Sequence, residues 1–259
     1  MDEAMTSKLA MIRDWLGSGS INIMGLPMAG KDTVGVQLAI DIGGKFLSSG
    51  AILRAYEAKH AHENLTRDGL LTPQSEFRRI VIPYLSAPEL DGYPLVLSAV
   101  GRWDGEEVDV INALEDKHPL KAVILLNISE GDVRERWETA QMTGDRAEGD
   151  AGRTDDSSVK KLERRFEEFR DKTLPVLTFY KSLDILATIN ADQPKDAVYN
   201  ELINKLADMA AASFLKDRLD DIDELEPEDP LLPPEEVAQT APTPETTETS
   251  EPPATPEQP

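Results

Sequence analysis

The sequence predicts an α/β fold in which a parallel β-sheet is covered by helices on both of its faces. Short apolar runs alternate along the chain with longer segments of helical periodicity. Two of these runs, 94–100 and 121–129, are continuously apolar, as expected of strands buried on both faces. A glycine-rich segment, 25–30, joins the first apolar run to the first helical segment. Together these observations favour a doubly covered parallel sheet over an antiparallel one.

The elements are predicted in order along the chain from these patterns. Residues 1–19 are expected to form a lead-in with a helix. The helix predicted over 159–183 should bend or restart near Pro175, because proline lacks the N–H that a helix interior requires. The predicted strands are 20–26, 94–100, 121–129 and 183–190, and the other predicted helices are 31–43 and 197–210.

Composition excludes several classes of protein. The 259 residues contain no cysteine, which excludes disulfides, thiolate catalysis and cysteine-ligated metal centres. A net charge of −22 argues against nucleic acid as a partner. No apolar run approaches the roughly 20 residues that cross a bilayer, and the polar start MDEAMTSKLAMIRDW is unlike a signal peptide. We therefore expect no membrane partner and a cytoplasmic location.

The acidity is concentrated at the C-terminal end. From residue 220 onward the chain holds 13 of its 49 acidic residues, 10 of its 18 prolines and neither lysine nor arginine. Such a segment cannot bury enough apolar surface to offset its conformational entropy, so 219–259 is predicted to be disordered. It is either a solubilising tail or a docking segment for an unknown partner, with Leu231–Leu232 as the candidate handle. The folded body is predicted over 20–218.

The segment GLPMAGKDT, residues 25–33, predicts a phosphate-binding loop. It has the spacing G-x-x-x-x-G-K between a strand and a helix. Gly25 and Gly30 allow the backbone to curl so that its N–H groups point at an anion, and the following helix adds its positive N-terminal end. Lys31 would place an ammonium group on the β- and γ-phosphates. The residue after the lysine is Asp32, and the hydroxyl comes one position later, as Thr33.

This loop, with the form G-x-P-x-x-G-K-x-T, resembles that of adenylate kinases and related nucleoside monophosphate kinases. The resemblance continues over about residues 20–207 through LSSGAILR, DGLLTPQ, VLSAVGRWDGEE, RERW, GRTDD, FRDKTLPVLTFY and INADQPKDAV. It implies a three-layer α/β/α P-loop fold with a five-stranded parallel sheet. It also implies a small insertion that binds the monophosphate, at about 50–92, and a short lid without metal, at about 138–153.

The resemblance implies a set of arginines around the phosphates, because phosphoryl transfer needs mainly positive charge and positioning. Arg54 and Arg102 match positions that hold the acceptor phosphate, and Arg136 matches the one that stacks on the donor base. Arg153 and Arg165 match those that close over the transferred group, with Arg164 as an alternative to Arg165. Arg146, within the lid, is a further candidate. The catalytic residues that the resemblance implies are Lys31, Arg102, Arg153 and Arg165. The implied ATP contacts are Gly25, Ala29, Gly30, Lys31, Asp32, Thr33, Arg136 and Gln193. The implied monophosphate contacts are Ser49, Gly50, Arg54, Leu71, Arg102, Glu106, Arg153 and Arg165.

The sequence departs from the family pattern where magnesium is expected. The family has an aspartate at the position of Ser98, and that aspartate helps to hold the water shell of the Mg²⁺ that accompanies ATP. Serine can hydrogen bond to a metal-bound water but brings no charge. Asp32 or Asp104 could compensate, and Thr33 is a candidate to hold the metal through water.

A second departure concerns the acceptor base. Members specific for AMP have a threonine and a glutamine where this chain has Ser49 and Glu106. A glutamine amide can donate and accept, whereas a carboxylate only accepts. Glu106 would therefore suit the N1–H and amino edge of guanine, or the amino group of cytosine, better than adenine, unless Glu107 makes the contact.

The expected activity is reversible transfer of the γ-phosphate of ATP·Mg²⁺ to a nucleoside monophosphate, in a monomer that closes over both substrates. Two alternatives remain open: a P-loop kinase of another small acceptor, and a weakly active or inactive nucleotide-binding interaction protein.

Three histidines, His60, His62 and His118, are expected at the surface. Trp103 and Trp137 are assigned to packing, with base stacking as the alternative.

Overall fold

The computed structural model describes residues 3–60, 65, 70–143 and 158–223. The chain divides into two compact units, Met1–Leu219 and Asp220–Pro259. The predicted tail from residue 224 onward and most of the predicted lid therefore lie outside the described residues. In the part of the chain that the structure describes, no helix combines the length and the apolar character needed to cross a bilayer.

The first unit is built on a five-stranded parallel sheet, which confirms the predicted fold class. The strand order is β2-β3-β1-β4-β5, and every neighbouring pair is parallel. All five strands therefore end at the same edge, where open α/β sheets bind ligands. The strands are β1 (Ser20–Gly25), β2 (Lys45–Ser48), β3 (Leu95–Ser98), β4 (Leu120–Asn127) and β5 (Leu186–Asn190).

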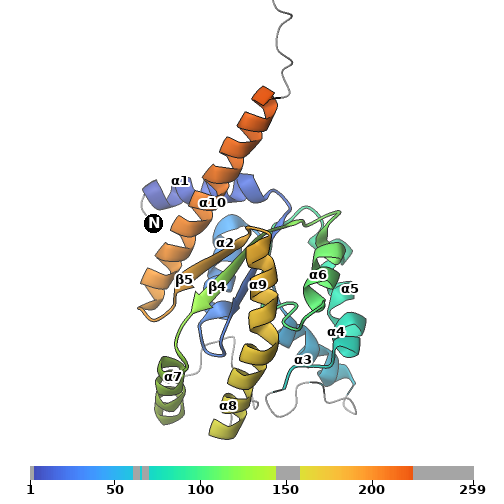
Figure 1. Cartoon of the computed structure of the whole chain (residues 1–259), viewed down its shortest axis with the longest axis vertical. Helices are drawn as coiled ribbons and strands as arrows, with labels where there is room; N and C mark the ends of the chain where they lie inside the picture. Colours follow the sequence, from blue (N-terminus) through green and yellow to red (C-terminus); the bar gives the residue numbers. More distant parts are fainter. Residues whose placement is uncertain (1–2, 61–64, 66–69, 144–157, 224–259) are drawn as a thin grey trace, which may run out of the picture. The chain divides into compact units, whose positions relative to one another are not determined.

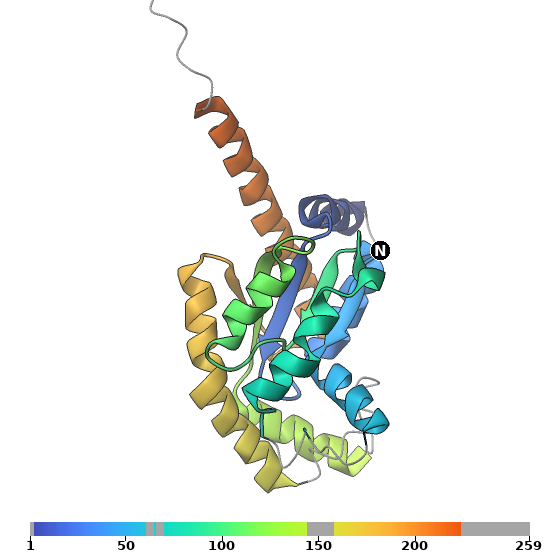
Figure 2. The same ribbon diagram turned by 90° about the vertical axis from the view of Figure 1, so that its right-hand side faces the viewer.

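Helices cover both faces of this sheet (Figures 1 and 2). Figure 1 shows α9 in front of the sheet and α2 behind it, with α7 and α8 beyond the ends of the strands. The helices are α1 (Glu3–Leu16), α2 (Lys31–Ile42), α3 (Ser49–Lys59), α4 (Gln74–Ile80), α5 (Ile82–Leu85), the 3₁₀ turn η1 (Pro88–Leu90), α6 (Glu106–Leu114), α7 (Glu130–Thr143), α8 (Val159–Glu168), the π-helical turn η3 (Phe169–Thr173), α9 (Leu174–Ser182) and α10 (Lys195–Asp223).

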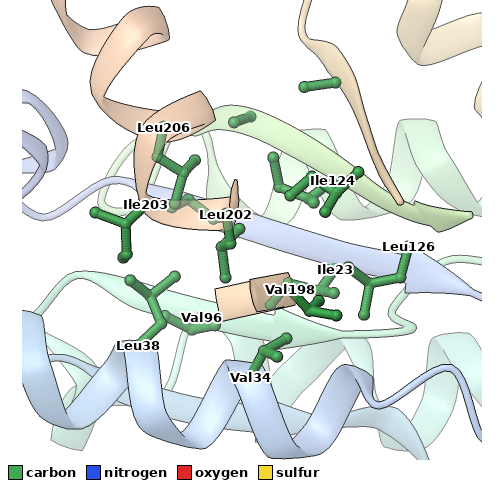
Figure 3. Packing of buried hydrophobic residues seen from close by; sticks show 14 of the residues in the cluster. Ile23, Val34, Leu38, Val96, Ile124, Leu126, Val198, Leu202, Ile203 and Leu206 are labelled. Carbon is green, nitrogen blue, oxygen red and sulfur yellow. The ribbon is translucent and has the colours of Figure 1, made fainter. Parts of the chain in front are cut away.

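The largest apolar cluster lies between the sheet and helices α1, α2 and α10. Figure 3 shows Leu38 from α2 and Leu202 from α10 converging on Ile23, Val96 and Ile124 of the sheet. These five side chains are completely buried. A smaller cluster on the other face joins α9 to β1 and β4. This packing explains why the central strands are apolar on both sides.

A separate cluster holds α3, α4, α5 and α6 together with β3. It is formed around Phe77, Val81, Leu85, Leu97 and Val110, which are all buried. This cluster shares no buried residue with the cluster around α2, because Leu95 and Leu97 point to the opposite face of β3 from Val96. The segment that carries the predicted acceptor residues therefore has its own hydrophobic support.

The long helix predicted over 159–183 restarts near its proline, as expected. Helix α8 passes into the π-helical turn η3, and α9 begins at Leu174 with Pro175 in its first turn. Proline is accommodated there because backbone N–H groups in the first turn of a helix have no partner within the helix, so its missing N–H costs no hydrogen bond. The turn before it takes the wider π-helical form.

Two expectations need correction. His118 was expected at the surface, but it is completely buried, and one ring nitrogen, Nδ1, lies 2.8 Å from the carbonyl oxygen of Ser18. The polar stretch around it is bonded to the segment between α1 and β1, where the hydroxyl of Ser18 donates to the carbonyl oxygen of Lys117 at 2.8 Å. His60 is half-buried and stacks on Tyr56, with ring centroids 4.0 Å apart, and His62 lies outside the described residues. The other correction is that the closing helix α10 begins at Lys195 and continues to Asp223, well beyond the predicted 197–210.

Candidate active site

The loop between β1 and α2 has a positive-φ backbone, which favours glycine, at both glycines of its G-x-x-x-x-G-K motif, Gly25 and Gly30. Gly25 has φ of 150° and Gly30 has φ of 91°. A Cβ atom on Gly25 would lie 2.7 Å from the carbonyl oxygen of Leu126, so the strand end packs directly against β4. The loop thereby stays against the sheet, and the N-terminus of α2 at its end offers N–H groups to an anion.

Lys31 is the first residue of α2, and its side chain folds back over this loop. Its Nζ donates to the carbonyl oxygen of Leu26 at 2.7 Å. The ammonium group is thus held at the mouth of the loop, within reach of an anion bound to the loop backbone. This is the position that the sequence motif predicts for a phosphate-binding lysine.

One cavity of about 730 Å³ opens at the edge where the strands end. Its size suits a nucleotide and a second small substrate, since sites for small molecules generally measure about 300–1,000 Å³. The predicted site residues that line it are Gly25, Ala29, Gly30, Lys31, Asp32, Thr33, Ser49, Gly50, Arg54, Leu71, Arg102, Arg136, Arg165 and Gln193.

Among the residues that the structure describes, four arginines from four different segments line this cavity. They are Arg54 of α3, Arg102 of the loop after β3, Arg136 of α7 and Arg165 of α8. Of the two neighbours on α8, Arg165 is half-buried and lines the cavity, whereas Arg164 is exposed and does not. Two further candidates, Arg146 and Arg153, lie outside the described residues.

Arg136 connects two of the loops that surround the cavity. Its guanidinium donates to the carbonyl oxygens of Ala191 at 2.6 Å and Met28 at 3.4 Å. The planar group is therefore held between the phosphate loop and the segment after β5. Trp137 also lines the cavity, whereas Trp103 does not. The ammonium group of Lys172 lies over the ring of Trp103, 3.8 Å from its centroid.

The loop after β3 is fixed by its own hydrogen bonds. The side-chain amide of Asn22, on β1, donates to the carbonyl oxygen of Val100 at 2.7 Å. The hydroxyl of Ser49 donates to the carbonyl oxygen of Ala99 at 2.6 Å, and Ala99 has a positive φ of 53°. These contacts place Arg102 at the sheet edge independently of any ligand.

Ser98, the last residue of β3, is bonded to the phosphate-loop helix. Its Oγ donates to Oδ1 of Asp32 at 2.5 Å, and both residues line the large cavity. Asp104 is exposed and is not among the lining residues. The structure therefore places one of the two carboxylates proposed as a substitute beside Ser98, and the other away from it.

Glu106 lies under a second, smaller cavity of about 20 Å³ that adjoins the first, a volume that holds roughly one water molecule. Its Oε2 accepts hydrogen bonds from the backbone N–H groups of Arg102 and Trp103, at 2.9 and 3.1 Å. Burial raises the pKa of the Glu106 carboxyl from 4.5 to about 7, and these two N–H groups oppose the shift. Glu106 therefore changes its charge close to neutral pH.

Glu168 is a residue of the cavity that the sequence did not single out. Its Oε2 accepts from the backbone N–H of Leu71 at 3.0 Å and from Nζ of Lys172 at 2.7 Å. It thereby links α8 to the segment before α4. No signal in the sequence distinguishes it, because it lies in a helix that is charged throughout.

No family model matches the sequence. The adenylate kinase of Bartonella tribocorum is 31% identical over 180 residues, which cover 65% of this chain and 89% of that protein. The chain belongs to the nucleoside monophosphate kinase-like family of P-loop kinases.

Other relatives of this P-loop kinase agree with that assignment. The adenylate kinase of Thermus thermophilus is 27% identical over 187 residues, covering 70% of this chain and 92% of that protein. The uridylate kinase of Saccharomyces cerevisiae is 22% identical over 222 residues, covering 80% and 99%. A solved structure of a gluconokinase from Sinorhizobium meliloti has the same fold, with a TM-score of 0.50, 19% identity and coverage of 76% of this chain and 97% of that one.

Proposed function

We propose that this P-loop kinase transfers the γ-phosphate of ATP to a nucleoside monophosphate and yields two diphosphates. The observation that carries the proposal is that Arg102 lines both cavities, the large one at the phosphate loop and the small one above Glu106. A donor phosphate on Lys31 and an acceptor phosphate on Arg102 would face each other across one space. That is the arrangement that in-line phosphoryl transfer requires.

Each cation has a separate task in this proposal. Lys31 and the loop N–H groups hold the donor phosphates, and Arg136 with Gln193 borders the donor base. Arg54 and Arg102 hold the acceptor phosphate, with Ser49, Gly50 and Leu71 beside the acceptor nucleoside. Arg165, together with Arg153 from outside the described residues, completes the charge around the transferred group. Arginine suits these roles because it remains charged and binds phosphate oxygens in pairs.

The residues at the sheet edge also fit magnesium, the metal that accompanies ATP in this proposal. Asp32, Thr33 and Ser98 offer only oxygen donors, which is the donor set that Mg²⁺ prefers. Among the described residues no group of three or more acidic or imidazole side chains could hold a metal without other ligands. Mg²⁺ commonly binds through one or two carboxylates, waters and substrate phosphates, so this set suffices. When bound, the metal would neutralise part of the phosphate charge.

The acceptor segment is proposed at 50–92 and the lid at 138–153. Helices α4 and α5 lie within the first range and α3 begins one residue before it, and all three contribute to the apolar cluster around Phe77 and Val81. Ser49, Gly50 and Leu71 line the large cavity, whereas Glu106 lines only the small one, which is too small for a base. Contact between Glu106 and an acceptor base would therefore require these helices to shift outward. We propose that closure then excludes water from the reacting phosphates.

The preferred acceptor base follows from the chemistry of Glu106 in this proposal. As a carboxylate it only accepts, which suits guanine or cytosine; as a neutral acid it gains one O–H donor and can both donate and accept, as adenine requires. Because its pKa is raised to about 7, both forms are present near neutral pH. The ratio of GMP to AMP turnover should therefore rise as pH increases through about 7.

Coupled production of ADP from ATP·Mg²⁺ with AMP, GMP, CMP and UMP tests the activity. Turnover of at least one monophosphate is expected, and Arg165→Ala should lower it by about 10²–10³-fold, the loss typical of a removed transition-state contact. The neighbouring variant Arg164→Ala provides the matched control and should behave as wild type. Turnover with none of the four acceptors, in a protein that binds ATP, would overturn the proposal and favour another acceptor or an inactive binder.

A further inference from the structure

A carboxylate and a hydroxyl meet where the phosphate loop faces the end of β3. The two groups belong to Asp32, in the first turn of α2, and to Ser98, which is only 1% exposed. Both line the large cavity, together with Lys31 and Thr33. The end of β3 thus provides a hydroxyl, and the negative charge next to it comes from the phosphate-loop helix.

The charges around the cavity indicate that the nucleotide needs a cation of its own. Among the described residues that line the cavity, six are cationic and five are acidic, which leaves an excess of one positive charge. ATP and a monophosphate bring several negative charges to this space, so the described side chains leave most of that charge uncompensated. The lining residues concerned are Lys31, Arg54, Arg102, Arg136, Arg165 and Lys195 against Asp32, Asp132, Glu135, Glu168 and Asp192.

We propose that Asp32 supplies the carboxylate that holds the magnesium of bound ATP, and that Ser98 orients it. The proposal rests on the proposed function, since it concerns the metal of the same ATP site. It places the acidic group of the metal site on the phosphate-loop helix instead of at the end of β3.

Three observations favour Asp32 for this role. Asp32 and Lys31 both line the large cavity, so the carboxylate faces the space that the β- and γ-phosphates would occupy. The hydroxyl of Ser98 donates to Oδ1 of Asp32 at 2.5 Å and so helps to fix the orientation of the carboxylate. Asp104, the other carboxylate near the end of β3, is exposed and outside the cavity lining.

A purely structural role would be a bond that ties α2 to β3. The two roles predict different results, because a structural bond affects folding but not the metal dependence of nucleotide binding. Calorimetric titration of the full chain with ADP, with and without Mg²⁺, separates them. Mn²⁺ bound in the nucleotide complex, detected by electron paramagnetic resonance, gives a second readout that does not depend on turnover.

We expect Mg²⁺ to raise the affinity of the wild type for ADP about tenfold or more, and Asp32→Asn to abolish that gain. The metal-free affinity of Asp32→Asn should equal or exceed that of the wild type, because a negative charge beside the phosphates is removed. Asp104→Asn is the matched control and should keep the full gain. Adding Ser98→Asp to Asp32→Asn should recover the gain, because a carboxylate then returns to the opposite side of the same site.

The outcomes separate this inference from the proposed function. If Asp32→Asn keeps the full gain, if Asp104→Asn loses it, or if the wild type binds ADP without any gain from Mg²⁺, the inference is wrong and the kinase assignment stands. If the wild type binds neither ADP nor ATP under either condition, the proposed function fails as well. If Asp32→Asn does not fold, Ser98→Ala serves instead: a weakened gain supports the inference, and an unchanged gain overturns it.

Discussion

Individual residues of this site owe their positions to contacts between segments that are far apart in sequence. Asp32 and Ser98 are separated by 66 positions and share one hydrogen bond. The sequence could suggest that either Asp32 or Asp104 replaces a missing charge, but it could not choose, because the choice depends on which loop faces β3. For the same reason Arg164 and Arg165 could not be told apart until the exposed and buried sides of α8 were known.

Gly25 offers a test of the phosphate loop. Gly25→Ala should lower the free energy of unfolding by about 3 kcal/mol, because the new Cβ would meet the carbonyl oxygen of Leu126 at 2.7 Å in a backbone conformation with positive φ. Gly92→Ala is the control, since Gly92 also has positive φ but open space around it, and about 1 kcal/mol is expected. Urea denaturation of both variants measures the difference; equal losses would show that the contact with β4 is unimportant.

Glu106 should make the stability of the fold depend on pH. Its pKa is raised in the folded state, from 4.5 to about 7, so the folded state binds more protons than the unfolded state between these values. Its contribution is therefore fully present below about pH 4.5 and is lost as pH rises toward 7, by up to about 1.4 kcal/mol per pH unit.

Glu106→Gln should remove that dependence. Unfolding free energies measured between pH 5 and pH 7.5 should fall with pH in the wild type more steeply than in this variant. Glu115→Gln, on the exposed side of the end of α6, should retain the slope of the wild type. Identical slopes in all three proteins would mean that burial does not perturb the Glu106 carboxyl.

At the scale of elements, four of the five strands of the described sheet were predicted from their apolar runs, and β2 was not. β2 has four residues, of which only Ser48 is buried, and it pairs at the edge of the sheet with β3 alone. A strand so short and so exposed has no periodicity of its own. The fifth strand was expected only from the family resemblance, whereas β1, β3, β4, β5 and the restart before α9 were evident from the residues.

The link between α8 and the segment before α4 can be tested at a single amide. Glu168→Ala should speed hydrogen exchange at the Leu71 N–H by about 10–100-fold, because a hydrogen bond to a charged group contributes about 1.5–3 kcal/mol. Glu167→Ala, the exposed neighbour, should leave that rate unchanged. If Leu71 exchanges equally in both variants, Glu168 does not hold this segment.

At the scale of the whole molecule, the buried positions identify the part of the chain that the fold requires. Within 195–220, the part of α10 whose burial the structure describes, the last buried residue is Ala210, and Phe214, Leu215 and Leu219 are all exposed. The first compact unit ends at Leu219. The acidic segment that follows was predicted from composition alone, and its role stays a prediction.

Truncation should therefore separate the two units. A chain ending at Leu219 should keep its melting temperature and its affinity for ATP, because no core residue is removed. A chain ending at Asn204 loses Leu206, Ala207 and Ala210 from the core and should be destabilised by several kcal/mol, on the order of 2–5 kcal/mol for the leucine alone. Differential scanning calorimetry and ATP titration compare the two truncated chains with the full chain. Loss of ATP binding in the chain that ends at Leu219 would show that the folded unit extends beyond that residue.

If Asp32 holds the magnesium of ATP as proposed, its charge would also affect which anions can compete for the site. A negative charge at the mouth of the phosphate loop would repel free orthophosphate, which brings no dication to offset it. Uncomplexed ATP would be disfavoured for the same reason. Occupancy of the donor site would then depend on the concentration of free Mg²⁺ as well as on that of ATP. A fall in either concentration would lower the turnover of the kinase in the same way.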